Sequence, residues 1–521
     1  MDSGATATSG DAEAGARGAA RGVREFYRHR HHHPAWCDLQ GPTTAADRAI
    51  QLLLAARSQG LEPSQYGATA LVREAASLRE RGFGATRPEP ERLAHFDVAL
   101  ARALLRYGLD LAHGRVARDS LDPGWRVKGA DQAATERLVR ALGSDSLAAV
   151  IDALGAPSPD ARALRDALRR YRAIAARGGW PAWSERGDEA EVADRLTARL
   201  AACGDLDSSA SGPNALRDAL RRFQRRHGLF ASGKLDTATS RQLEVPIEAR
   251  IETMVWNLER LRWRQRPYLE PRIEVNVPGF ALAVRDSDRI IETHAIVVGK
   301  PSHPTPIFSD TVTFLELNPT WTLTKRIIAE EILPALKRDT GAVSKQGLEV
   351  WRVDRKIPQL VTAASVDWST LASDSFPFLV RQPAGGENPL GLVKFMCPNE
   401  YDVYLHDTNA RGLFKAQRRA FSHGCVRVQD PARLALWLLR GTKLEEPDSL
   451  DAYLKTLTWR RVPLKRRVPV DFEYRTAWVD SSGTVQFRPD LYGIDRRLAD
   501  ARTGGALRRF FLNPRAEWAA P

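Results

Sequence analysis

Two hydrophobic periodicities divide the chain into a helical part and a β-rich part. Over residues 45–177 apolar side chains recur at spacings of three and four, as in 49–54 and 98–109, which is the repeat of a helix with one buried face. From residue 273 the apolar residues alternate or form short runs, as in 273–277 and 294–299, which is typical of β-strands. The pattern predicts a helical N-terminal region followed by a β-rich domain.

A compact unit separates these two regions. Leu216, Leu220 and Phe223 lie on one face of an arginine-rich helix, Gly228 can adopt the left-handed conformation that ends a helix, and Asp236 can cap the next one. We therefore expect a small three-helix domain and, after it, an amphipathic connector helix. Their predicted ranges are 191–247 and 248–270.

The β-rich domain is expected to cover 271–460 and to carry an insertion at about 327–376 whose beginning reads as helical. Turn residues 480–483 lie between two short β-like segments, so we predict that 461–521 form a hairpin and tail that pack on the scaffold or on the β-rich domain. With a helical scaffold domain at 29–190, the predicted fold class is multi-domain α+β.

Composition narrows the class of protein. A chain of 521 residues with a formal charge of +13 predicts several domains and an anionic partner, such as nucleic acid, acidic lipid or a cell-wall polymer. No apolar run approaches the length of a membrane-spanning helix. Residues 1–28 are of low complexity and are expected to be disordered, and they contain no apolar segment of the kind that a secretion signal needs.

Metal and disulfide chemistry are not expected. The four cysteines Cys37, Cys203, Cys397 and Cys425 are scattered without metal-ligand spacing, and Cys397 lies in an apolar run that indicates burial. We interpret the histidine run at 29–33 as a solvated loop, with metal chelation as the alternative.

The strongest chemical signal lies between residues 401 and 428. His406 stands on an alternating apolar segment, and Cys425 follows nineteen positions later within Ser-His-Gly-Cys-Val-Arg (422–427). A nucleophilic cysteine needs a base or a cationic surrounding to lower its pKa, and His406, His423 and Arg427 are candidates for these roles. Spacing alone leaves the choice between the two histidines open. Gly424 would let a substrate approach closely, and the amides of Gly424 and Cys425 could form an oxyanion hole.

The two-part motif, Tyr-Leu-His-Asp-Thr at 404–408 followed by Ser-His-Gly-Cys-Val-Arg, resembles the L,D-transpeptidase family with its YkuD-type catalytic domain. The segment FQRRHGLFASGKLDTATSRQL resembles a peptidoglycan-binding domain. Together with the Asn-Pro motifs at 318–321 and 388–391 and the helical N-terminal region, these features are similar to the large multi-domain Gram-negative subgroup.

The resemblance implies a role for each motif residue. Cys425 would be the nucleophile and His406 the base, which Asp407 would orient through its backbone carbonyl or side chain. The remaining expected site residues, supporting or substrate-binding, are Tyr404 in the acyl-donor channel, Ser422, His423, Gly424 and Arg427. The 327–376 insertion would cap the cleft, and no metal or organic cofactor is implied.

The implied reaction is cross-linking of peptidoglycan stem peptides, diaminopimelate to diaminopimelate, through a cysteine thioester that releases D-alanine. Expected partners are stem peptides and glycan, with carbapenems as covalent inhibitors and no nucleic acid, and the implied location is the periplasm. Alternatives are an L,D-carboxypeptidase or an exchange catalyst, a cell-wall cysteine endopeptidase, and a non-catalytic wall-binding scaffold. Endopeptidases of that kind usually place the cysteine before the histidine, whereas His406 comes first here.

Overall fold

The protein divides into two compact units in the computed structural model, which describes residues 7–80, 88–116, 132–207, 213–263, 271–287, 289–353, 357–372 and 376–503. One unit comprises Met1–Pro267 with Arg475–Pro521, and the other comprises Tyr268–Tyr474. The first is mainly helical and the second is β-rich, which confirms the predicted multi-domain α+β class.

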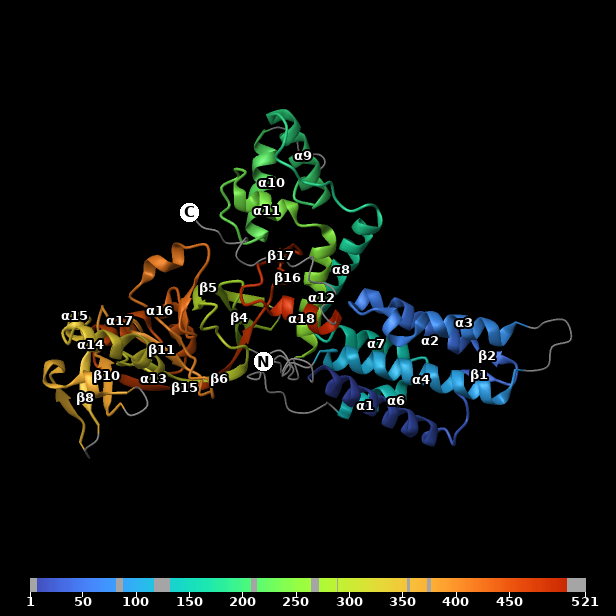
Figure 1. Cartoon of the computed structure of the whole chain (residues 1–521), viewed down its shortest axis with the longest axis horizontal. Coiled ribbons are helices and arrows are strands. Elements are labelled where there is room, and N and C mark those ends of the chain that lie inside the picture. The colour runs from blue at the N-terminus through green and yellow to red at the C-terminus, as the bar shows by residue number, and fades with distance from the viewer. Residues whose placement is uncertain are drawn as a thin grey trace. The chain divides into compact units, whose positions relative to one another are not determined.

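Helix α4 (Pro90–His113) is the centre of the helical scaffold. Its side chains Leu100, Leu104 and Tyr107 are at most 1% exposed, and other helices of the scaffold pack around it (Figure 1). Those helices are α1 (Ala7–His29), α2 (Thr44–Leu54), α3 (Ala68–Arg79), α6 (Gln132–Ala141) and α7 (Leu147–Gly155). Helix α8 (Pro159–Ala176) follows, and the short strands β1 (Cys37–Asp38) and β2 (Gly41–Pro42) form a small ladder.

The predicted disorder of residues 1–28 is wrong for the described part, because α1 begins at Ala7. Ala19, Val23 and Phe26 are buried, and their spacing of four and three puts them on one face of the helix. The segment therefore does have an apolar face to bury. Its high content of alanine and glycine made its composition look like that of a disordered segment. The histidine run lies at the end of α1, where His31 and His32 adopt positive φ.

The small three-helix domain is present as α9 (Glu189–Ala202), α10 (Pro213–Arg226) and α11 (Thr237–Glu244). Its core includes Leu220 and Phe223, and Asp236 accepts a hydrogen bond from the Thr239 amide at 2.7 Å, as expected of a cap. The connector helix is α12 (Ile247–Arg262).

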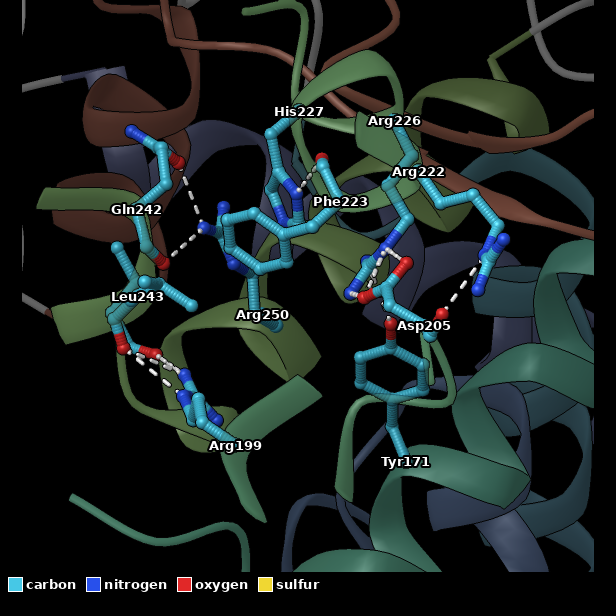
Figure 2. Close-up of polar contacts among 11 residues, drawn as sticks. Tyr171, Arg199, Asp205, Arg222, Phe223, Arg226, His227, Gln242, Leu243 and Arg250 are labelled. Atoms are coloured by element: carbon cyan, nitrogen blue, oxygen red, sulfur yellow. Dashed lines mark hydrogen bonds and ion pairs between the residues drawn. The ribbon is translucent and has the colours of Figure 1, made fainter. Parts of the chain in front are cut away.

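A buried ion pair lies within this domain, next to scaffold helix α8. The Arg226 guanidinium donates from Nε to both carboxylate oxygens of Asp205, at 2.8 and 2.9 Å, and each side chain is 5% exposed. Figure 2 shows the Tyr171 hydroxyl, on α8, beneath this pair, with Arg226 Nη1 3.5 Å away. Two further arginines bind the C-terminal end of α11: Arg199 donates to the carbonyl of Leu243 and Arg250 to the side chain of Gln242 (Figure 2).

The expected C-terminal hairpin is also present, as β16 (Ala477–Val479) and β17 (Val485–Phe487). It packs on α8 and α12, and the Asn257 side chain of α12 donates to Thr476 Oγ1 at 2.7 Å. Helix α18 (Ile494–Thr503) lies against α12 as well. Of the two surfaces predicted for the tail, it uses the scaffold helices.

The second unit is built on a nine-stranded sheet in the order β13-β5-β14-β12-β11-β6-β15-β3-β4, and a further pairing between β4 and β5 closes it into a barrel. The strands are β3 (Arg272–Asn276), β4 (Ala281–Asp286), β5 (Arg289–Gly299), β6 (Ser309–Leu317), β11 (Val393–Met396), β12 (Leu405–His406), β13 (Ala420–Ser422), β14 (Val426–Val428) and β15 (Arg460–Glu473). Helices α16 (Pro431–Leu438) and α17 (Pro447–Lys455) precede the last of these strands.

Strand β15 contradicts the predicted domain end at residue 460. It pairs antiparallel with β6 and parallel with β3, so the β-rich unit extends to Tyr474. The register with β6 shifts between Pro463 and Val468, and this irregularity accommodates prolines that a regular inner strand does not tolerate.

The insertion predicted as helical is a mixed subdomain. It contains α13 (Lys325–Ile327), a π-helical turn η3 (Ile328–Ile332), α14 (Leu333–Arg338) and α15 (Ala342–Lys345). It also contains an antiparallel sheet in the order β7-β10-β8-β9, formed by Trp321–Thr322, Phe378–Gln382, Glu349–Arg352 and Gln359–Val361. The strand Phe378–Gln382 belongs to this subdomain, whose core includes Leu336, Val350 and Trp368.

Candidate active site

The parallel pairing of β12 with β14 brings the two halves of the motif together. Leu405 pairs with Val426 and His406 with Arg427, and Leu405 and Val426 are fully buried in the barrel core. Because side chains alternate along a strand, Tyr404, His406, Cys425 and Arg427 all lie on the other face. Extending this register places Tyr404 opposite Cys425, and His406 lies two residues further along its strand, opposite Arg427.

Hydrogen bonds fix the turn that presents Cys425. Ser422 Oγ accepts from the Gly424 amide at 3.1 Å and donates to the Cys425 carbonyl at 2.5 Å. Thr305 Oγ1 donates to the Gly424 carbonyl at 2.7 Å. Gly424 has a φ of 122°, a conformation that favours glycine. Ser422 is therefore a structural part of the turn, a role that differs from the substrate contact implied for it.

The expected oxyanion hole changes as a result. The Gly424 amide already donates to Ser422 and cannot also serve a substrate oxygen. The Cys425 amide donates to none of the residues that the structure describes, so it is the free donor at this turn.

Burial raises the pKa of the Cys425 thiol above its ordinary value of 9.0. Hydrogen bonds from the backbone and the phenol of Tyr404 and the charge of Lys394 act in the opposite direction but are smaller. The thiol also lies 3.7 Å from the carbonyl oxygen of Asp402. The site therefore holds a neutral thiol at neutral pH, contrary to the expectation of a lowered pKa.

His406 is 4% exposed. Burial lowers its pKa to about 3, the positive charges of Arg427 and Lys394 contribute in the same direction, and a hydrogen bond to the backbone of Asp407 opposes them. Its Nδ1 is buried without a hydrogen-bond partner among the described residues. No hydrogen bond joins His406 to Cys425 in this part of the chain, although both side chains stand on one face of neighbouring strands.

The Asp407 side chain points away from the imidazole. Its Oδ2 accepts from the Leu392 amide at 2.9 Å, and Oδ1 lies 3.4 Å from Arg411 Nη2. Of the two ways in which Asp407 was expected to orient His406, the geometry favours the backbone.

His423 lies outside the Cys425–His406 face. Its Nε2 is 2.8 Å from Glu331 Oε1 of the mixed subdomain and 3.4 Å from Lys300 Nζ, and its ring packs edge-on against His303 at 4.9 Å. His303 in turn contacts Glu330 at 3.1 Å. The second candidate base therefore contacts the mixed subdomain.

Two residues of the site were missed by sequence reasoning, Lys394 and Glu316. Register pairs Glu316 of β6 with Lys394 of β11, Lys394 with His406, and His406 with Arg427, so the four form one row across the sheet. Lys394 Nζ is 3.4 Å from Glu316 Oε2 and 3.9 Å from the centre of the Tyr404 ring. The sequence signal that could have identified Lys394 is a charged residue within the otherwise apolar strand Val393–Met396.

A cavity of about 330 Å³ lies beside this row. It is lined by Glu316, Thr320, Thr322, Leu390, Lys394, Tyr404 and Trp459. The Asn-Pro motifs support its rim, because the Asn388 side chain donates to the Pro319 carbonyl at 3.0 Å. Since Tyr404 contacts both the cavity and Cys425, a molecule in the cavity would lie next to the thiol.

Among the described residues, no group of three or more His, Cys, Asp or Glu side chains could hold a metal ion. In the same part of the chain, no helix has the length and apolar character needed to cross a membrane.

Comparisons with known families agree with the division of the chain. Residues 21–168 match a model described as "Scaffold domain", residues 194–243 match "Putative peptidoglycan binding domain", and residues 270–445 match "L,D-transpeptidase catalytic domain".

One curated relative, "Putative L,D-transpeptidase" of Haemophilus influenzae (strain ATCC 51907 / DSM 11121 / KW20 / Rd), is 35% identical over 250 residues. These cover 47% of this chain and 49% of the relative, so the match spans about half the length of each.

Two solved structures are also similar in part. L,D-transpeptidase 1 of Mycobacterium tuberculosis is 14% identical with a TM-score of 0.16, covering 39% of this chain and 60% of that one. L,D-transpeptidase (Yku) of Stackebrandtia nassauensis is 14% identical with a TM-score of 0.21, covering 57% and 98%. Scores this low carry no argument about the fold of this chain.

Proposed function

We propose, on the premise that this chain carries the catalytic domain of the YkuD L,D-transpeptidase family at residues 270–445, that it cross-links peptidoglycan stem peptides through a thioester on Cys425. The observation that carries the proposal is the placement of Cys425 and His406 on one face of two paired strands. The Nδ1 atom of His406, which has no hydrogen-bond partner among the residues that the structure describes, supports it, because a general base needs a free lone pair.

In the first half-reaction, Sγ of Cys425 attacks the carbonyl carbon of diaminopimelate in the donor tetrapeptide while Nδ1 of His406 accepts the thiol proton. The Cys425 amide is the donor available to the developing oxyanion. Collapse of the tetrahedral intermediate breaks the C–N bond, and His406 returns the proton to the departing amine of D-alanine.

In the second half-reaction, the side-chain amine of a diaminopimelate residue in a neighbouring stem attacks the thioester. His406 takes the amine proton and returns it to the sulfur as the C–S bond breaks. Water in place of the amine would make the product that of an L,D-carboxypeptidase.

The neutral state of both groups supports a concerted proton transfer. Burial favours the neutral thiol and the neutral imidazole, and proton transfer during attack then avoids a separated charge pair in a buried site. Arg427, whose pKa is lowered by burial, supplies a fixed positive charge for a substrate carboxylate.

The other domains support the same substrate. The match of residues 194–243 to a peptidoglycan-binding model and the net charge of +13 suit an anionic wall polymer. We place the protein in the periplasm with the cell wall, and we expect carbapenems to acylate Cys425.

Intact-mass spectrometry tests the proposal. Wild-type protein incubated with the donor tetrapeptide, or with a carbapenem, should gain the mass of one acyl group, and the Cys425→Ala variant should gain none. Cys203→Ala, which removes a thiol in the other unit, is the matched control and should be acylated normally. An adduct on Cys425→Ala would refute the assignment, and release of shortened monomers without dimers would indicate the carboxypeptidase.

A further inference from the structure

The ion pair between Glu316 and Lys394 forms one wall of the cavity beside Tyr404. Both residues lie on inner strands of the barrel, and their side chains are 21% and 15% exposed. Removing two charges from most of their water is costly, and a hydrophobic pair of similar volume is often as stable. Stability alone therefore does not explain an ion pair at this position.

The geometry of the pair leaves it open to a ligand. Lys394 Nζ and Glu316 Oε2 are 3.4 Å apart, which is longer than a charge-assisted hydrogen bond of about 2.7–2.9 Å. An ammonium has three donors and a carboxylate accepts several hydrogen bonds, so the loose contact with Glu316 and the packing of Lys394 Nζ on the Tyr404 ring leave hydrogen-bonding capacity on both groups. The lining by Thr320 and Thr322 adds hydroxyl groups to the same cavity.

The ammonium of Lys394 and the carboxylate of Glu316 lie side by side, so together they complement a ligand that carries both a carboxylate and an ammonium group. The α-amino-acid end of a diaminopimelate side chain has an ammonium and a carboxylate on one carbon. Its methylene chain would lie along the apolar surfaces of Leu390 and Trp459, which also line the cavity.

The position of the pair relative to the thiol agrees with this ligand. Lys394 is the register partner of His406 on the neighbouring strand, about 5 Å away at the backbone. Tyr404, which also lines the cavity, hydrogen-bonds the thiol. A side chain held at Glu316 and Lys394 would place the carbonyl of the same residue near Cys425.

We propose that Glu316 and Lys394 bind the zwitterionic end of the donor's diaminopimelate, with Lys394 on its carboxylate and Glu316 on its ammonium. This assignment rests on the proposed function and specifies the residue that the donor must carry. It makes the two residues determinants of donor specificity.

Equilibrium binding tests the subsite without requiring turnover. Calorimetry on the Cys425→Ala protein compares two tetrapeptides, one with the free side-chain carboxylate and one in which that carboxylate is a carboxamide. The free acid should bind at least tenfold more tightly, and the added change Lys394→Met should reduce this ratio to about twofold or less. Lys443→Met, which removes an exposed lysine, is the matched control and should keep the ratio.

A second comparison, between donor peptides with a free and an acetylated side-chain amine, tests the role of Glu316 in binding. Acetylation of the side-chain amine of the donor should weaken binding to the Cys425→Ala protein, and Glu316→Gln should remove that difference. The subsite is refuted if the unmodified and modified peptides bind equally well. It is also refuted if Lys394→Met weakens both peptides by the same factor, which is the result expected of a purely structural ion pair.

These experiments distinguish a failure of the proposed reaction at Cys425 from a failure of the proposed subsite at Glu316 and Lys394. If the wild-type protein forms no thioester while the binding ratios are as expected, the proposed reaction is wrong and the subsite stands. If the thioester forms with acid and amide donors at equal rates and the peptides bind equally well, the reaction stands and the subsite is wrong.

Discussion

Burial shifts the pKa values of Cys425 and His406 in opposite directions, and in both cases it favours the neutral form of the side chain. Burial raises the pKa of the thiol and lowers that of the imidazole to about 3, because in both cases the charged form is the one that loses solvation. His406 is consequently neutral from about pH 4 upward, and Cys425 is neutral well above pH 7.

The first prediction concerns the pH dependence of the thiol. Alkylation of Cys425 by iodoacetamide, which reacts with the thiolate, should become faster with each unit of pH and continue to rise beyond pH 9. The rate is measured from the mass of the peptide that contains Cys425. A plateau reached below pH 7 would instead indicate a stable thiolate–imidazolium pair, and the proposed proton transfer would then be wrong.

The second prediction separates the two histidines. His406→Ala should slow acylation by the donor peptide at least a hundredfold, because no other neutral base lies on that face of the sheet among the described residues. His423→Ala should cost less than tenfold, since His423 contacts Glu331 at 2.8 Å. Single-turnover rates of D-alanine release measure both, and the reverse ranking would assign the base to His423.

The third prediction concerns Gly391, which packs on Asp407. A Cβ at Gly391 would lie 2.2 Å from Asp407 Oδ2, and the φ of 59° is already strained for other residues. Gly391→Ala should displace Asp407 and with it the backbone that holds His406, so acylation should slow at least tenfold. Gly412→Ala, with open space at its Cβ, is the matched control, and equal rates for the two variants would contradict the role of the Asp407 backbone.

At the scale of elements, the Ser422 hydroxyl makes two of the hydrogen bonds that hold the turn before β14, and Thr305 makes a third. Ser422→Ala removes the bonds to the Gly424 amide and the Cys425 carbonyl, each contributing on the order of 1 kcal/mol. The fourth prediction is a roughly tenfold slower acylation and a lower Tm for this variant. Ser369→Ala, which alters an exposed serine bonded to Asp367, should change neither, and unchanged acylation in Ser422→Ala would show that the turn holds its shape without it.

The sequence predicted the helices and strands whose apolar residues recur with a regular period, and it missed strands whose apolar residues do not. Strand β15 carries Pro463 and Pro469 and a basic run between them, which in isolation argue against an inner strand. Its pairing depends on a register shift that only the barrel defines. Strands β8 and β9 were missed because their segment lacks an alternating pattern.

The same distinction holds for the site. Cys425 was identified by its motif, and the resemblance implied His406 rather than His423 as the base. The register of β12 on β14 and the contact of His423 with Glu331 agree with that prediction. Lys394 and Glu316 belong to the site only because β6 and β11 are neighbours. A row of residues across a sheet is invisible in a linear sequence.

At the scale of the whole molecule, the fifth prediction concerns the buried ion pair inside the three-helix domain, which lies next to Tyr171 of α8. Asp205→Ala would leave Arg226 buried without its carboxylate, which costs about 3–5 kcal/mol. The Tm of the helical unit should fall and its retention on isolated cell walls should weaken. Asp194→Ala, an exposed aspartate on α9, is the matched control, and a Tm equal to that of the wild type would show that another contact replaces the pair.

Strand β15 also determines when the barrel can form. It occupies the place between β6 and β3, which precede it in the chain by more than a hundred residues. Contacts this distant in sequence form slowly. During synthesis, the edges of β6 and β3 therefore stay unpaired until β15, which ends at residue 473, has been made. A chain stopped at residue 460 would keep every residue of the Cys425 site and still expose those edges, and its expected fate is aggregation through strand pairing between molecules.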